Sequence, residues 1–259
     1  MCILFLAIRK HEDFPLIVAA NRDEFYSRPT RSSHLWQPDE VVLAGRDEQA
    51  GGSWMGLSRS GRVAALTNVR GPTEVVEGGP SRGGLVLDYL RGSHQDSDYL
   101  EMLEQEGERY SGFNLLFGHW NALHVYSNRN PLAVQLESGF FGLSNAALNT
   151  PWPKLSRGVR AMEDYVSSTG SPDPDQLMML LRDESRAEDV NLPHTGVPIE
   201  TERMLSSIFI RSETYGTRAS TVLMVDQGGG YHWIEQSYGV NGTLGQKVTY
   251  NGTFQAGGQ

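Results

Sequence analysis

The pattern of apolar and polar positions predicts strands at both ends of the chain and helices between them. Continuous apolar runs over Cys2–Ile8 and Pro15–Ala20 are separated by a polar turn, which is typical of a hairpin buried on both faces. Charged residues at 21–24 are expected to close the second strand. Further strands are expected at residues 41–44, 53–57, 62–67, 113–117, 122–126, 140–143, 208–211, 217–225, 231–236 and 247–254.

Helical spacing is clearest in the middle of the chain, where Leu155, Val159 and Met162 recur on one face. Other helices are expected at residues 81–91, 99–105 and 177–181. The acidic, proline-containing segment 183–203 is expected to be flexible. Strand-rich ends around central helices favour a layered α+β architecture. Since no linker separates two parts that could each form a core, we expect one domain over residues 1–259.

Composition excludes several classes of protein. The chain has 259 residues, a single cysteine and a formal net charge of −9. One cysteine excludes an intramolecular disulfide and a multi-thiolate zinc site. The acidic balance argues against nucleic-acid binding, which needs clustered basic residues. The seven histidines form no paired ligand set, so we expect neither a metal nor a required cofactor.

No apolar run approaches the roughly 20 residues that span a bilayer. The apolar start of the chain is interrupted by Arg9 and is too short for a signal peptide. We therefore expect a soluble, cytoplasmic protein without stable membrane insertion. The sequence does not set its oligomeric state.

Cys2 carries the most informative chemistry. An initiator methionine is generally removed when the second residue is small, which leaves a thiol and a free α-amine on the same residue. The amine has an ordinary pKa of about 7.7–8.0, so its neutral form can accept the thiol proton and activate the sulfur as a nucleophile. A lone cysteine is also often just a small buried hydrophobe, and its position alone leaves both readings open.

Eight segments in series resemble the NRDE family, the family of the transport and Golgi organisation protein 2. They are Met1–Phe5, Leu16–Pro29, Gly51–Gly56, Ala64–Asn68, Ser81–Gly83, Gly112–Leu115, Gly142–Asn145 with Pro151–Trp152, and Tyr215–Arg218. This family resembles, more distantly, the cysteine N-terminal-nucleophile (Ntn) hydrolases of the bile-salt hydrolase and penicillin V acylase group. The resemblance implies a four-layer αββα sandwich and cleavage of amides.

The resemblance also implies roles for individual residues. Cys2 matches the nucleophile, and Asp23 matches the aspartate that holds its amine and thiol. Asn68 and Asn145 match residues at the oxyanion site, where fixed amide donors stabilise the tetrahedral intermediate. Arg218 matches the arginine beside the thiolate, so we expect it to lower the pKa of Cys2.

One departure concerns Ala20, which stands where the acylases have an arginine. Asn21, Arg22 and Glu24 are therefore candidate ligand-binding residues, although charged residues at a strand end are also commonly just solvated. Arg22 suits a small-molecule or lipid-like anionic ligand, bound through a carboxylate, a haem propionate or a CoA phosphate. Pocket walls are expected on the loops at 25–50, 69–80 and 183–207.

Two functions compete at this stage, and a third hypothesis, suggested only by the name of the family, is a scaffold in secretory trafficking. The first is a cysteine Ntn amidohydrolase acting on a non-peptide or acyl C–N bond. The alternative, implied by the family resemblance, is a non-catalytic carrier that holds haem or an acyl-CoA lipid in the same cleft. No haem-ligation motif is present, so haem enters only as a transported ligand.

Overall fold

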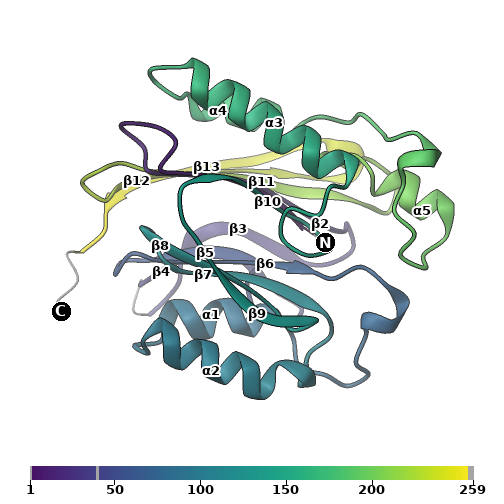
Figure 1. The fold of residues 1–259 in the computed structure, drawn as a ribbon, viewed down its shortest axis with the longest axis horizontal. Coiled ribbons are helices and arrows are strands. Elements are labelled where there is room, and N and C mark those ends of the chain that lie inside the picture. Colours follow the sequence, from purple (N-terminus) through teal and green to yellow (C-terminus); the bar gives the residue numbers. More distant parts are fainter. Residues whose placement is uncertain (1, 39–40, 256–259) are drawn as a thin grey trace.

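The computed structural model describes residues 2–38 and 41–255, which form two antiparallel β-sheets packed face to face. Figure 1 shows the four layers, with helices on the outer side of each sheet. The α+β class and the αββα sandwich are confirmed. No helix in the described part of the chain is long and apolar enough to cross a membrane.

The first sheet has six strands in the order β10-β1-β2-β11-β12-β13. Their bounds are β1 Cys2–Ile8, β2 Leu16–Phe25, β10 Gly139–Leu143, β11 Tyr215–Val225, β12 Gly230–Tyr238 and β13 Leu244–Thr253. Helices α3 (Pro153–Ser168) and α4 (Pro174–Leu180) cover its outer face (Figure 1). The short helix α5 (Ile199–Met204) lies beyond one end of this sheet (Figure 1).

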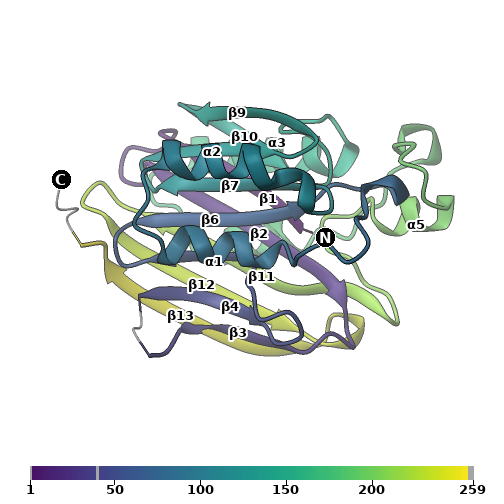
Figure 2. The same cartoon turned by 90° about the horizontal axis from the view of Figure 1, so that it is seen from below.

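The second sheet has seven strands in the order in which they follow along the chain. They are β3 Thr30–Leu35, β4 Val42–Asp47, β5 Met55–Ser58, β6 Arg62–Asn68, β7 Phe113–His119, β8 Ala122–Ser127 and β9 Asn130–Leu136. Helices α1 (Gly83–Arg91) and α2 (Asp96–Glu106) cover its outer face, as Figure 2 shows from below. The described residues also form four 3₁₀ turns, η1 Pro72–Glu74, η2 Gly107–Arg109, η3 Asp189–Asn191 and η4 Val240–Gly242.

Strand β1 is buried on both of its faces. Leu4 and Leu6 point into the core between the sheets, whereas Ile3 and Phe5 point into the core beneath α3 and α4. A central strand covered on both sides needs apolar residues at every position. This explains the continuous apolar run at the start of the sequence.

Several features differ from the sequence-based expectation. Strands β3 and β9 were not expected from the sequence: β3 is mostly polar, and β9 lies at the edge of the sheet with Leu132 and Val134 exposed. Asn21–Glu24 lie inside β2 rather than after it, because β11 pairs with β2 as far as Phe25. Residues 208–211 are not a strand. Segment 183–203 is anchored by the buried Leu192 and Glu202.

Helix α3 approaches the first sheet unusually closely because two glycines leave room for it. A Cβ atom on Gly158 would lie 2.1 Å from Cζ of Phe5, and one on Gly142 would lie 2.7 Å from Cγ of Leu155. Neither position tolerates a side chain without movement of its neighbour. The close contact fixes the first turn of α3 near the end of the sheet at which β1 begins (Figure 1).

Glu235 ties the two sheets together inside the core. It lies on β12 and is 1% exposed, and its carboxylate accepts hydrogen bonds of 2.7 Å from both the backbone N–H and the hydroxyl of Ser33 on β3. Burial raises the pKa of Glu235 from its ordinary value. Folding therefore shifts the Glu235 carboxyl towards its protonated form relative to the unfolded chain.

We expect Glu235→Leu to lower the free energy of unfolding by about 1–3 kcal/mol, because the Ser33 N–H loses its buried acceptor.

The stabilisation contributed by a group whose pKa is raised on folding is complete at low pH and is lost as pH rises through that pKa. Since Glu235→Gln cannot titrate there, the wild type should lose stability relative to this variant as pH rises. Urea unfolding at a series of pH values measures both effects. A constant difference between wild type and Glu235→Gln would contradict the assigned direction.

Candidate active site

A cleft of about 320 Å³ opens at the end of the sandwich where β1 begins. The residues that line it come from both sheets, from the turn before α1 and from two loops. They are Cys2, Arg22, Asp23, Glu24, Arg28, Asp47, Ala50, Ser53, Trp54, Leu66, Asn68, Gly79, Pro80, Ser81, Arg82, Gly83 and Ser111. Five of the eight residues singled out in the sequence are therefore together in one cleft.

Cys2 occupies the first position of β1 and is partly buried against the core between the sheets. In the antiparallel register it pairs with Arg22 of β2. Burial raises the pKa of the Cys2 thiol, and the nearby carboxylates of Asp23 and Glu24 act in the same direction. Arg22 opposes this rise. The raised pKa is the reverse of the lowering expected from the sequence.

Arg22 and Glu24 line the cleft, whereas Asn21 does not. The Arg22 guanidinium lies over the Trp54 ring at 4.3 Å and donates one hydrogen bond of 3.0 Å to the Thr30 hydroxyl. It makes no ion pair within the described residues, so it can still accept an anionic partner. Glu24 is half-buried at the rim of the cleft.

Asn21 is completely buried, and its amide is used by the fold. Its Nδ2 donates to the backbone carbonyls of Leu181 and Ile208 at 2.8 and 2.9 Å, and its Oδ1 accepts from the Ser220 hydroxyl at 2.6 Å. These contacts fasten the segments after α4 and α5 to the first sheet. The placement explains Asn21 as a structural residue and gives it no contact with the cleft.

Asp23 is fully buried at the inner wall of the cleft. Its Oδ1 accepts a hydrogen bond of 2.8 Å from the hydroxyl of Thr217 on β11. Burial raises the pKa of Asp23, and the positive charge of Lys154 is the strongest influence that opposes the rise. The ionised carboxylate thus depends on the cations around it.

The two candidate oxyanion residues are placed differently. Asn68 ends β6 and lines the cleft, and no hydrogen bond engages its side-chain amide among the described residues. The Asn145 side chain lies behind it, donating from Nδ2 to the Asn68 carbonyl at 2.9 Å and accepting from the Ser144 hydroxyl at 3.2 Å. Asn68 therefore lines the cleft with its side-chain amide unengaged in the described part of the chain, whereas Asn145 lies outside the lining and hydrogen-bonds to the Asn68 backbone.

Arg218 is engaged by backbone carbonyls at the end of β2 and in the turn that follows it. Its Nη1 donates to the carbonyls of Phe25, Tyr26 and Arg28 at 2.8–3.3 Å. Arg218 is the residue at which the β2–β11 register shifts, and it does not line the cleft. These hydrogen bonds from Arg218 fix the conformation of the turn. The positive charge that acts on Cys2 from the strand beside it is that of Arg22.

A buried ion pair behind the cleft was not anticipated from the sequence. Arg70 and Glu202 are 2.5 Å apart, and each side chain is only 3% exposed. Arg70 also lies over the Trp152 ring at 4.6 Å and donates its backbone N–H to the Asn145 carbonyl at 2.8 Å. Because Glu202 comes from the acidic segment expected to be flexible, no sequence pattern links it to Arg70.

Lys154 is a second buried cation missed by the sequence analysis. It is 2% exposed in the first turn of α3. The sequence did contain a signal for this burial. Four residues of α3 that recur at four-residue spacing are all buried, namely Lys154, Gly158, Met162 and Val166. In a helix that spacing places a lysine on the face that packs against the sheet.

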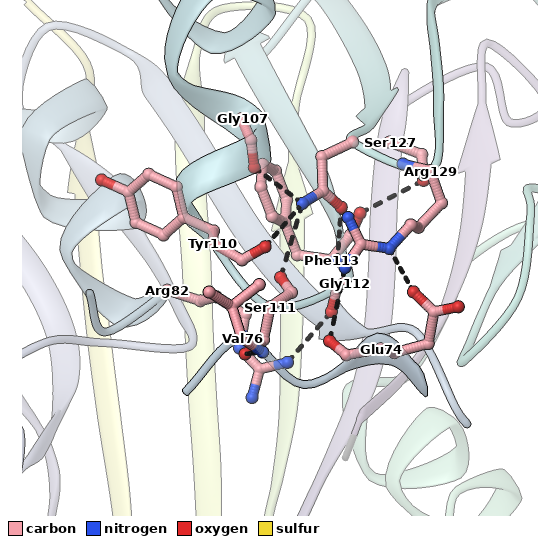
Figure 3. Close-up of polar contacts among 11 residues, drawn as sticks. Glu74, Val76, Arg82, Gly107, Tyr110, Ser111, Gly112, Phe113, Ser127 and Arg129 are labelled. Atoms are coloured by element: carbon pink, nitrogen blue, oxygen red, sulfur yellow. Dashed lines mark hydrogen bonds and ion pairs between the residues drawn. The ribbon is translucent and has the colours of Figure 1, made fainter. Parts of the chain in front are cut away.

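The cleft wall formed by residues 79–83 and 111 is stiffened by a polar network. Figure 3 shows the Arg82 guanidinium pointing to Gly112, whose carbonyl accepts its hydrogen bond at 2.9 Å. The Ser111 hydroxyl accepts from the Val76 N–H at 3.0 Å, and Glu74 forms an ion pair with Arg129. Of the three loops expected to form walls, the first two contribute lining residues, whereas residues 183–207 contribute none.

Comparison with solved structures gives the class of the fold. A variant of conjugated bile acid hydrolase from Clostridium perfringens aligns with 99% of this chain and 97% of its own, with a TM-score of 0.54 and 10% sequence identity. The N-acylethanolamine-hydrolyzing acid amidase orthologue from Caenorhabditis elegans covers 86% of this chain with a TM-score of 0.52. The protein thus has the Ntn-hydrolase fold, and at this identity the likeness concerns the fold alone.

Sequence comparison gives the family. The family model described as Transport and Golgi organisation 2 matches residues 1–239. The human Transport and Golgi organization protein 2 homolog is 34% identical over 257 residues, which cover 92% of this chain and 93% of that protein. The Drosophila melanogaster protein is 28% identical over 269 residues. The chain belongs to the Transport and Golgi organisation 2 family, as its motifs indicated.

We expect Arg70→Met and Glu202→Gln each to lower the free energy of unfolding by about 3–5 kcal/mol, because each leaves a buried charge without its partner. The double variant Arg70→Met/Glu202→Met should cost less than the sum of the corresponding single variants. Urea unfolding measures all of these changes.

The matched control is Glu184→Gln, which removes the exposed ion pair with Arg211. It should change stability by no more than about 1 kcal/mol. Equal effects of Glu202→Gln and Glu184→Gln would show that the buried pair does not hold the segment in place.

Proposed function

We propose that the protein is a cysteine Ntn amidohydrolase that cleaves a non-peptide or acyl C–N bond. The observation that carries the proposal is the position of Cys2 at the start of β1, in an open cleft shared with Asp23 and the uncommitted amide of Asn68. This arrangement supplies a nucleophile, a carboxylate that can orient an amine, and a donor for a developing negative charge.

The proposed reaction begins with removal of Met1, which frees the Cys2 α-amine. The neutral amine takes the thiol proton as the sulfur attacks the carbonyl carbon of the substrate amide. The carbonyl electron pair moves to oxygen, and a tetrahedral intermediate forms. When this intermediate collapses, the C–N bond breaks and the leaving nitrogen takes the proton from the ammonium. Water then hydrolyses the thioester and restores the thiol.

The proposal assigns the oxyanion to Asn68. Its amide is fixed at the strand end and lies in the cleft, whereas that of Asn145 is committed behind it. Fixed neutral donors stabilise charge that develops in the transition state without a cost of reorganisation at that moment. Asp23 follows Arg22 on β2, the strand that pairs with β1 at Cys2. Its carboxylate can there orient the Cys2 α-amine that removal of Met1 frees.

Arg22 supports a substrate that carries an anionic group. Its guanidinium is fixed by Trp54 and Thr30, is 5% exposed and faces no carboxylate at ion-pair distance within the described chain. A carboxylate or phosphate can meet such a guanidinium through two parallel hydrogen bonds. Arg82 adds a second positive charge to the opposite wall of the cleft.

One observation favours the alternative function, in which the cleft holds a ligand without cleaving it. Burial raises the pKa of the Cys2 thiol above its ordinary value, and this disfavours the thiolate that a nucleophile needs. The same Arg22 would then bind the anionic group of the cargo, such as haem or an acyl-CoA. A cytoplasmic location is part of both proposals.

The test compares the wild type with Cys2→Ala, Asn68→Ala and Arg22→Ala on N-acyl amides, haem and acyl-CoA, after intact mass has shown whether Met1 is absent. For the hydrolase we expect Cys2→Ala to abolish turnover, because the nucleophile is gone. Asn68→Ala should lower kcat by a factor of about 10²–10³. Arg22→Ala should raise KM for anionic substrates and leave neutral ones unchanged.

Arg160→Ala is the matched control, since it removes an exposed arginine from the outer surface of α3. Retention of Met1 in an active preparation would exclude the amine as base. Binding of haem or acyl-CoA that survives Cys2→Ala but weakens in Arg22→Ala, without turnover in any variant, would establish the carrier instead.

A further inference from the structure

The cleft continues past Cys2 into a small recess in the core between the two sheets. Four residues line both spaces, namely Cys2, Arg22, Trp54 and Leu66. The recess measures about 10 Å³, which is about the space that one water molecule or one methyl group occupies. The Cys2 side chain packs against the same core. A small group bonded to its sulfur is therefore at the entrance of the recess.

The inner walls of the recess are apolar and are held by paired strands of both sheets. Leu4 of β1 pairs with Ala20 of β2, and Met55 of β5 pairs with Ala65 of β6. All four side chains belong to the core between the sheets. The lining is completed by two residues whose polar side chains are engaged elsewhere, Asn21 and Thr221. Because such a core is close-packed, the recess cannot widen without repacking its walls.

The outer cleft has the opposite character. Ten of the 17 described residues that line it are charged or carry a hydroxyl or amide group. A long apolar chain lying along this wall would cover these groups without replacing their hydrogen bonds to water, which is unfavourable. The cleft therefore suits the polar portion of a substrate, whereas the recess gives apolar contact to a group the size of a methyl.

We propose that Cys2 accepts short acyl groups, with acetyl the best match, and that the substrate is an amide of such a short acid with a polar amine. This inference rests on the proposed role of Cys2 as the nucleophile. The acyl methyl enters the recess beside Ala20 and Met55, and the amine portion stays in the cleft with Arg22. A longer acyl chain must either repack the recess or lie across the charged wall, so each added methylene slows the acylation of Cys2.

The test uses the p-nitrophenyl esters of acetate, butyrate, hexanoate and octanoate. The Cys2 sulfur bonds to the acyl carbon, the ester C–O bond breaks, p-nitrophenolate leaves, and the thiol proton passes to solvent. Released p-nitrophenolate gives the rate, and intact mass shows the acyl adduct and the processing of Met1. Subtracting the rate of Cys2→Ala removes reactions of amines. Dividing by the rate of the same ester with N-acetylcysteine corrects for its intrinsic reactivity.

After these corrections, we expect the acetate ester to react about tenfold faster than the butyrate ester or more, because one methylene in a closely matched apolar pocket changes a rate by at least this factor. The octanoate ester should be the slowest. Equal rates, or rates that rise with chain length, would overturn the inference. Absence of any acylation that depends on Cys2 would overturn it together with the role of Cys2 as nucleophile.

Two variants test whether the recess makes the selection. Met55→Ala enlarges it and should raise the rate of the hexanoate ester relative to acetate by about tenfold or more. Ala20→Val fills it and should slow the acetate ester. Thermal unfolding checks that each variant is folded, and Leu66→Ala, at the junction of recess and cleft, takes the place of Met55→Ala if that variant does not fold.

The matched control is Met162→Ala, which truncates an equally buried methionine in the core beneath α3. It should keep the wild-type order of the esters. A folded Met55→Ala protein with that same order would contradict the placement of the acyl group in the recess.

The ester series and the amide assays can fail separately. A preference for acetate without turnover of any N-acyl amide would support the short-acyl inference and contradict the hydrolase. Amide turnover that is lost in Cys2→Ala, together with a preference for long acyl chains, would support the hydrolase and overturn the inference.

Discussion

The antiparallel register of β1 and β2 is the constraint on which the site depends. This register pairs Cys2 of β1 with Arg22 of β2. Asp23 is the next residue along β2. Side chains alternate between the two faces of a strand, so a slip of one residue would exchange the faces of every side chain in β1. Cys2 would then leave the inner face, and Ile3 and Phe5 would lose their packing under α3. The apolar runs that fix this register therefore also fix the chemistry.

Around that register, the cleft draws its groups from segments far apart in the chain. Asn68 comes from the opposing sheet, while the support behind it comes from Asn145, Arg70 and Glu202. Each polar side chain in this support is buried, and most are joined by hydrogen bonds. Satisfied buried networks hold their members in one arrangement. The uncommitted groups are those that face the cleft, namely the Asn68 amide, part of the Arg22 guanidinium and the thiol.

The same burial that fixes the site works against its ionisation. It raises the pKa values of Cys2 and Asp23, and it lowers that of Lys154. These shifts have one cause, because each group loses the solvation of its charged form. Positive charge nearby offsets this effect, and Arg22 supplies such a charge beside Cys2. The reactivity of the Cys2 thiol thus depends on the electrostatics of a few buried groups.

The sequence by itself determined the central strands, the main helices, the layered class and the position of Cys2 beside the Asn21–Glu24 segment. Apolar periodicity reports local burial, and strand pairing between close neighbours follows from it. The tertiary structure decided that Asn21 and Arg218 bind backbone carbonyls, that Asn68 faces the cleft, and that Glu202 meets Arg70 across 132 positions. It also placed Lys154 in the interior. These outcomes depend on which distant side chains meet in space. The order of polar residues along the chain does not identify the distant residues that will pack against them.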